Sequence, residues 1–231
     1  MNPVLTPAEL DILSHLDGCT LANAIETFRK RLRNEGFVDH TVRCLFPQLP
    51  PMVGYAATIK IRGSSPATAG PAYRESTAWW DYMLTLPEPR VVVVQDVAER
   101  PGLGSLIGVV HMNILRSLNC AGVVTNGAVR NIPAAEKAGF CLFAGGVSVS
   151  HAYVHIIEFG QPVEIGGLII QSGDLLHGDL HGVQTIPSDI ADKVPAAAAE
   201  IIAREQEIIT LCRSKDFSLE KLRDLIARQN P

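Results

Sequence analysis

The sequence has no long apolar run and no concentration of positive charge, and both absences restrict what the protein can do. No apolar stretch approaches the roughly 20 residues that a membrane-spanning helix needs. Residues 1–4 lack the basic start and the apolar core of a signal peptide. With 20 Lys and Arg against 24 Asp and Glu, the formal net charge is −4, which argues against a nucleic-acid-binding surface. We therefore expect a cytoplasmic protein that contacts neither membranes nor nucleic acids.

Closely spaced cysteines and a complete dinucleotide-binding motif are also missing. Cys120 and Cys141 lie in apolar surroundings, which predicts buried, reduced thiols. No Gly-x-Gly-x-x-Gly segment follows a strand with an acidic partner beyond it. The scattered cysteines are odd in number and lack the spacing of a zinc site; they are Cys19, Cys44, Cys120, Cys141 and Cys212.

What is present is a regular alternation of strand-like and helix-like segments over 231 residues. It predicts an α/β protein, with residues 1–231 forming a single domain. Helices are expected within residues 6–35, where Thr6-Pro-Ala-Glu9 has the pattern of a capping box, and in the tail 189–229. The run Val91–Val94 predicts a strand that is covered on both faces. The basic run at 29–33 is expected on the solvated face of a helix.

Two segments predict a pocket for a small anion. Residues 102–108 are rich in glycine and lead into a helix expected from Gly108 to Leu118, whose first N–H groups would be free to bind an anion. Within residues 122–131 a buried strand is expected to lead to Arg130, whose guanidinium can bind a carboxylate through two hydrogen bonds. Neither segment carries a carboxylate where metal-assisted chemistry would need one.

Three segments resemble the aldolase/RraA family, which includes 4-hydroxy-4-methyl-2-oxoglutarate aldolases, oxaloacetate decarboxylases and the RraA regulators of ribonuclease E. They are Gly122–Asn131, Gly139–Tyr153 and Gly173–Val183, within a resemblance that extends from about Leu16 to Pro187. The resemblance implies a three-layer α/β/β sandwich related to the swivelling phosphohistidine domain. It also implies assembly as a homotrimer or a hexamer.

The same resemblance assigns the site residues. In the family an acidic residue is followed by twenty others and then by Arg-Asp; here these positions hold Val109, Arg130 and Asn131. The arginine is kept as the remaining catalytic residue, and both carboxylates are lost. The family holds the carboxylate of a small 2-oxo acid through the arginine and through backbone N–H groups at the helix start. In this chain those residues are Gly108, Val109, Val110, His111 and Arg130.

The resemblance also implies a divalent metal, magnesium or manganese, at the position of Asn131. An asparagine offers only a neutral oxygen to these hard ions, so we expect much weaker binding. Val109 can neither position nor deprotonate a water molecule. Asn126 also stands where many relatives have aspartate, and Glu136 is the nearest acid that could serve instead.

A second polar cluster is formed by His177, Asp179 and His181. Alternation along a strand would place all three on one face, which is compatible with a metal site. The other interpretation, which we favour, is a hydrogen-bonded strand end beside Gly182.

Two functions of different classes remain open. The first is a metal-dependent carbon–carbon lyase that cleaves or decarboxylates pyruvoyl-type oxo acids. The second is a catalytically lapsed family member that binds a small oxo acid or regulates a protein partner. Similarity favours the first, and the residues Val109 and Asn131 favour the second.

Overall fold

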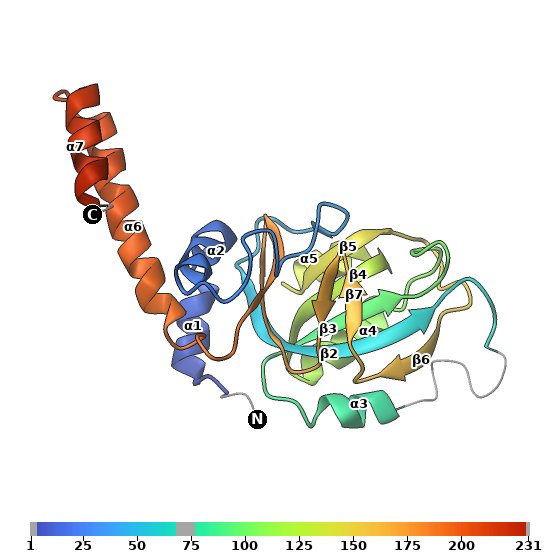
Figure 1. Ribbon diagram of the computed structural model, residues 1–231. Helices are drawn as coiled ribbons and strands as arrows, with labels where there is room; N and C mark the ends of the chain where they lie inside the picture. Colours follow the sequence, from blue (N-terminus) through green and yellow to red (C-terminus); the bar gives the residue numbers. More distant parts are fainter. Residues whose placement is uncertain (1–3, 68–76, 230–231) are drawn as a thin grey trace.

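An eight-stranded mixed sheet lies at the centre of the computed structural model, which describes residues 4–67 and 77–229 (Figure 1). The strand order is β1-β5-β4-β3-β2-β9-β10, and β6 also pairs with β2. The sheet consists of β1 (Arg43–Cys44), β2 (Met52–Arg62), β3 (Arg90–Asp96), β4 (Cys120–Val129), β5 (Cys141–Val147), β6 (His155–Phe159), β9 (Leu175–Asp179) and β10 (Gly182–Ile186). A separate hairpin consists of β7 (Val163–Ile165) and β8 (Leu168–Ile170).

Strands β2, β3, β4 and β5 are parallel to one another, so their carboxyl ends lie along one edge of the sheet. The connections between them contain α3 (Ala78–Met83), α4 (Val109–Ser117) and α5 (Ile132–Lys137). Ligands of α/β proteins commonly bind outside the carboxyl ends of parallel strands. Arg130 directly follows β4 and therefore lies at this edge.

The sheet is covered on both faces. On β3, Val92 and Val94 pack in one apolar cluster with α3, α4 and α5, whereas Val91 and Val93 pack in another with β7 and β8. All four valines are at most 1% exposed, so the predicted burial on both faces is confirmed. The helices, the sheet and the hairpin form three layers, which agrees with the expected α/β/β arrangement.

The first helix begins as the sequence predicts, and the second ends earlier than expected. The Thr6 side chain accepts the Glu9 N–H while the Glu9 carboxylate accepts the Thr6 N–H, which confirms the capping box of α1 (Pro7–Ser14). Helix α2 (Gly18–Thr27) stops where Arg29 adopts a left-handed backbone with φ +53°. The prediction that the basic run at 29–33 lies on a helix is therefore wrong, because this turn ends α2 before it.

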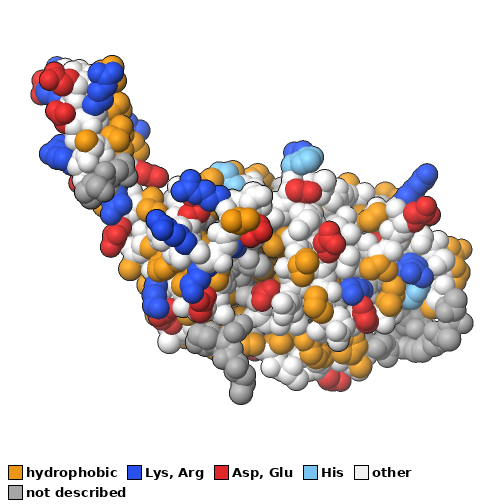
Figure 2. All heavy atoms as spheres, viewed as in Figure 1, with side chains coloured by type: hydrophobic (Ala, Val, Ile, Leu, Met, Phe, Trp, Pro, Cys, Tyr) orange, Lys and Arg blue, Asp and Glu red, His pale blue; other side chains and the backbone are white. Residues whose placement is uncertain are grey.

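The basic run does not form a positively charged face. Lys30 forms an ion pair with Asp189, and Arg33 with Glu26. In the view of Figure 2, Lys and Arg side chains are interspersed with Asp and Glu.

The carboxyl-terminal helices extend away from the sheet (Figure 1). Helix α6 (Val194–Arg213) starts against α2, where Val194 and Ala198 are buried, and α7 (Leu219–Gln229) folds back along it. Both helices lie within the predicted tail 189–229. Among residues 4–67 and 77–229, no helix is both long and apolar enough to cross a membrane.

Candidate functional site

A pocket of about 340 Å³ opens at the carboxyl edge of the sheet, beside the start of α4. It brings together all but one of the predicted site residues, the exception being Asn131, and adds three that the sequence did not indicate. Its walls consist of Trp80, Gly108, Val109, Val110, His111, Ile114, Arg130 and His151.

Arg130 is held between the strand that precedes it and the helix start. Its backbone N–H donates to the Ile107 carbonyl at 3.1 Å, and its Nη1 donates to the Val149 carbonyl at 3.3 Å. Its Nε is buried and has no hydrogen-bond partner among the described residues. A buried donor without a partner costs free energy unless a ligand satisfies it. The guanidinium therefore has donors to offer to a ligand in the pocket.

Gly108 allows the helix start to approach this arginine. It is the N-cap residue of α4, and a Cβ added there would lie 2.8 Å from Arg130 Nε and 3.1 Å from Asn131 Oδ1. Real Cβ atoms do not come that close to other heavy atoms, so a larger residue would displace the guanidinium. The close approach places the positive end of the helix dipole beside Arg130.

The side chain of Asn131 caps the start of α4 and does not line the pocket. Its backbone is left-handed, with φ +59° and ψ +40°, a conformation that asparagine tolerates better than most residues. Its side-chain Oδ1 accepts the Val109 backbone N–H at 3.1 Å. Of the N–H groups predicted to bind an anion, that of Val109 is therefore already engaged, while that of Val110 lies in the first turn of α4 and has no acceptor within the helix.

The pocket has an aromatic wall. The rings of Trp80 and His111 lie with their centroids 6.3 Å apart and their planes at 58°. Burial lowers the pKa of His111, and the neighbouring His151 lowers it further. No local sequence pattern connects Trp80 on α3, or His151, with the start of α4. Their positions follow from the tertiary fold.

The nearby acids are engaged elsewhere. Glu136 accepts a hydrogen bond from Gln48 at 2.7 Å and does not line the pocket. Asp96 accepts the N–H groups of Ala98 and Gly102, as expected of an aspartate that begins a turn. Asn126 is bonded to the Asp96 backbone through both its amide oxygen and its amide nitrogen. None of these side chains brings a carboxylate into the lining of the pocket.

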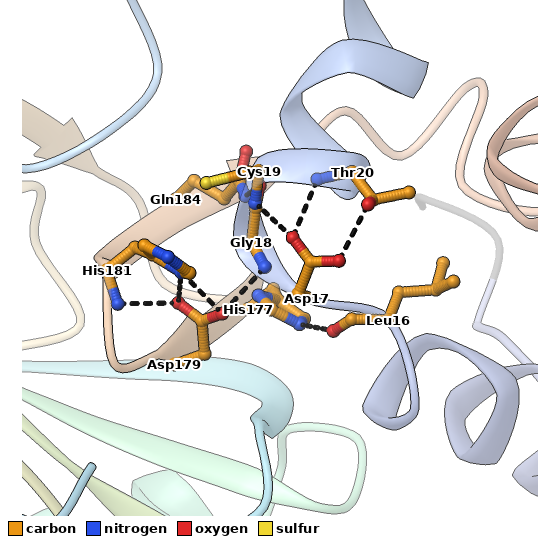
Figure 3. A network of polar contacts seen from close by, with 9 residues as sticks. All are labelled: Leu16, Asp17, Gly18, Cys19, Thr20, His177, Asp179, His181 and Gln184. Carbon is orange, nitrogen blue, oxygen red and sulfur yellow. Dashed lines mark hydrogen bonds and ion pairs between the residues drawn. The ribbon is translucent and has the colours of Figure 1, made fainter. Parts of the chain in front are cut away.

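The second polar cluster joins β9 to the amino-terminal helices (Figure 3). Asp179 accepts the Gly18 N–H at 2.7 Å and the His181 N–H at 2.8 Å, and it lies 3.0 Å from His181 Nδ1. His177 Nε2 lies 2.9 Å from the Leu16 carbonyl and donates to it. Asp179 thus bonds to the backbone and to His181, and His177 bonds to the backbone, which supports the hydrogen-bonded interpretation. Among the described residues, no group of three or more His, Cys, Asp or Glu could hold a metal ion.

The cysteines are all free in the described part of the chain. Burial raises the pKa of Cys120 to about 12 and that of Cys141 to about 11. Cys120 is buried as predicted, but Cys141, the first residue of β5, is only partly buried against the apolar cluster that contains Val91 and Val93. Thiols with such pKa values are poor nucleophiles at neutral pH.

Comparison with known proteins places this chain in one family. The family model described as Aldolase/RraA matches residues 19–184, so the chain belongs to the RraA-like family. A curated relative, the "Putative 4-hydroxy-4-methyl-2-oxoglutarate aldolase" of Halalkalibacterium halodurans, is 28% identical over 189 residues, covering 78% of this chain and 90% of the relative.

Solved structures support the same fold. An uncharacterized protein from Pseudomonas syringae pv. tomato superposes with a TM-score of 0.75 at 23% identity, covering 96% of each chain. RraAS2 of Streptomyces coelicolor, described as an unusual member of the RNase ES inhibitor RraA protein family, superposes with a TM-score of 0.69 at 17% identity, covering 88% of this chain and 96% of that one. At these identities the likeness establishes the fold alone.

Proposed function

We propose that this protein binds the anion of a small 2-oxo acid in the pocket between Arg130 and the start of α4, and that it has little or no metal-dependent lyase activity. One observation carries the proposal. The pocket keeps a guanidinium whose buried Nε has no partner among the described residues, and none of the described residues that line the pocket carries a carboxylate. The positively charged half of the family's site is present, and the negatively charged half is missing.

The residues at the family's metal position do not fit magnesium or manganese. Asn131 provides a neutral oxygen that already accepts the Val109 N–H, and Val109 itself has an apolar side chain. Hard divalent ions prefer charged oxygen ligands that are free to coordinate them. We therefore derive no step of a reaction through a metal ion.

In the proposed complex the ligand carboxylate lies against Arg130. The guanidinium donates to it, and the backbone N–H groups of Val110 and His111 supply further donors at the positive end of α4. The Val149 carbonyl holds Nη1 and so orients the guanidinium. These groups bind and orient an oxo acid, but none of them stabilises an enolate as a metal ion would.

A metal-dependent aldolase or decarboxylase is the competing function, and the identity with the Halalkalibacterium halodurans relative favours it. Calorimetric titration with pyruvate, with magnesium present and with a chelator present, distinguishes the two. We expect the same affinity under both conditions. Pyruvate binding that requires magnesium would contradict the proposal, and so would the absence of any binding.

We also propose that the protein assembles as a homotrimer or a hexamer, as the family does. Exposed apolar side chains near the pocket support this, since Val147 is 65%, Val149 96% and Tyr153 60% exposed. Apolar surfaces of this kind often mark contacts between protein chains.

A further inference from the structure

The pocket is much larger than a carboxylate and is mostly apolar beyond Arg130. Its volume is about 340 Å³, and the apolar side chains of Trp80, Val110 and Ile114 are among those that line it. Apolar walls gain free energy when an apolar group replaces water against them. The part of the ligand that lies beyond its carboxylate therefore meets a surface suited to hydrocarbon.

The described lining of the pocket holds one permanent positive charge. Arg130 is the only Lys or Arg among the described residues that line it. Burial and then His151 lower the pKa of His111, so this imidazole is largely neutral at pH 7. A second carboxylate would lose water beside Trp80 and Ile114 without gaining a permanent cation. Burying an unpaired charge in this way is strongly unfavourable.

We propose that the natural ligand is a 2-oxo acid with a single carboxylate and an apolar tail, aromatic or branched aliphatic, which lies against Trp80, Val110 and Ile114. This inference rests on the proposed function, because Arg130 and the start of α4 must first hold the carboxylate. It departs from the dicarboxylic oxo acids that the family resemblance implies. The aromatic wall of Trp80 and His111 would contact the ring of an aromatic tail, for which offset or tilted packing is favourable.

Calorimetric titration of the full chain with four oxo acids tests this. The four are pyruvate, phenylpyruvate, 4-methyl-2-oxopentanoate and 2-oxoglutarate. We expect phenylpyruvate and 4-methyl-2-oxopentanoate to bind at least about tenfold more tightly than pyruvate, since burial of two methylene groups is already worth about that factor. We expect 2-oxoglutarate to bind no more tightly than pyruvate.

A substitution at the apolar wall makes the test sharper. Val110 lines the pocket and is 68% exposed, so Val110→Lys is compatible with folding. It adds a cation where the tail would lie, and we expect it to reverse the preference, so that 2-oxoglutarate binds more tightly than phenylpyruvate. Ile169→Lys is the matched control, because Ile169 is 65% exposed on β8 and does not line the pocket. This control should keep the wild-type preference.

The outcomes separate this inference from the proposed function. If pyruvate binds but 2-oxoglutarate binds more tightly than phenylpyruvate, the apolar-tail inference is wrong and the oxo-acid site stands. If pyruvate binds and Val110→Lys leaves the order of affinities unchanged, the tail does not lie on this wall and the inference is also wrong. If none of the four acids binds, both proposals fail.

Discussion

Replacement of Arg130 by methionine should remove most of the affinity for oxo acids while leaving the fold intact. Methionine keeps the length and the apolar stem of the side chain and removes only the guanidinium. In the folded protein that guanidinium makes one side-chain hydrogen bond, to the Val149 carbonyl at 3.3 Å. Its loss should therefore change the free energy of unfolding by no more than about 1 kcal/mol.

The expected effect on binding is larger. A hydrogen bond to a charged group is worth about 1.5–3 kcal/mol, so losing it should weaken pyruvate binding by roughly 10- to 150-fold at about 1.4 kcal/mol per factor of ten. The helix start can supply only about 0.3–1 kcal/mol for an anion, which is too little to compensate. The guanidinium of Arg130 lines the pocket and is therefore the charged donor group that a ligand carboxylate would meet.

Calorimetry with pyruvate or oxalate measures this effect, and thermal unfolding checks that the variant is folded. Arg116→Met is the matched control, because Arg116 is an exposed arginine in the last turn of α4 and does not line the pocket. It changes the net charge equally and should leave binding unchanged. Equal affinities for wild type and Arg130→Met would refute the assignment of the pocket.

Three further predictions concern stability, geometry and assembly. Burial favours a raised pKa for Asp179, but hydrogen bonds from Gly18 and His181, together with the His181 charge, lower this pKa below its ordinary value. The stability that the ionised Asp179 contributes is therefore present above about pH 4 and should be lost as the pH falls through the lowered pKa. The free energy of unfolding, measured with urea at a series of pH values, should fall at acidic pH in the wild type and fall less in Asp179→Asn. An equal fall in both proteins would contradict this prediction. Gly108→Ala should weaken pyruvate binding severalfold in calorimetry, because the added Cβ would displace Arg130 Nε; unchanged affinity would mean that this close approach is unimportant. Light scattering at micromolar concentration should report a trimer or a multiple of it, and a monomer would refute the proposed assembly.

Much of the fold could be predicted because its signals are local. The run Val91–Val94 can be apolar at every position only in a strand covered on both faces, and the Thr6–Glu9 capping box fixes where α1 begins. The end of α2 was missed because its left-handed residue is Arg29, where no glycine marks the turn. A non-glycine residue in that conformation gives the sequence no clear stop signal.

The site was predictable in part for the same reason. A glycine before a helix and an arginine after a strand both point to the carboxyl edge of a parallel sheet, and there Gly108 and Arg130 lie in contact. The hydrogen bond from the Val109 N–H to Asn131 could not be foreseen, because it depends on the left-handed backbone of Asn131. The place of Trp80 in the pocket wall depends on the tertiary contact between α3 and α4, where its ring lies against that of His111.

A turnover assay tests the central claim most directly. Wild-type protein with magnesium or manganese is offered 4-hydroxy-4-methyl-2-oxoglutarate or oxaloacetate, and pyruvate release is followed with coupled lactate dehydrogenase. The double variant Val109→Glu with Asn131→Asp serves as the comparison, since it returns both carboxylates to the site. We predict wild-type turnover hardly above background, and metal binding with measurable pyruvate release in the double variant. Robust metal-dependent turnover by the wild type would contradict the account.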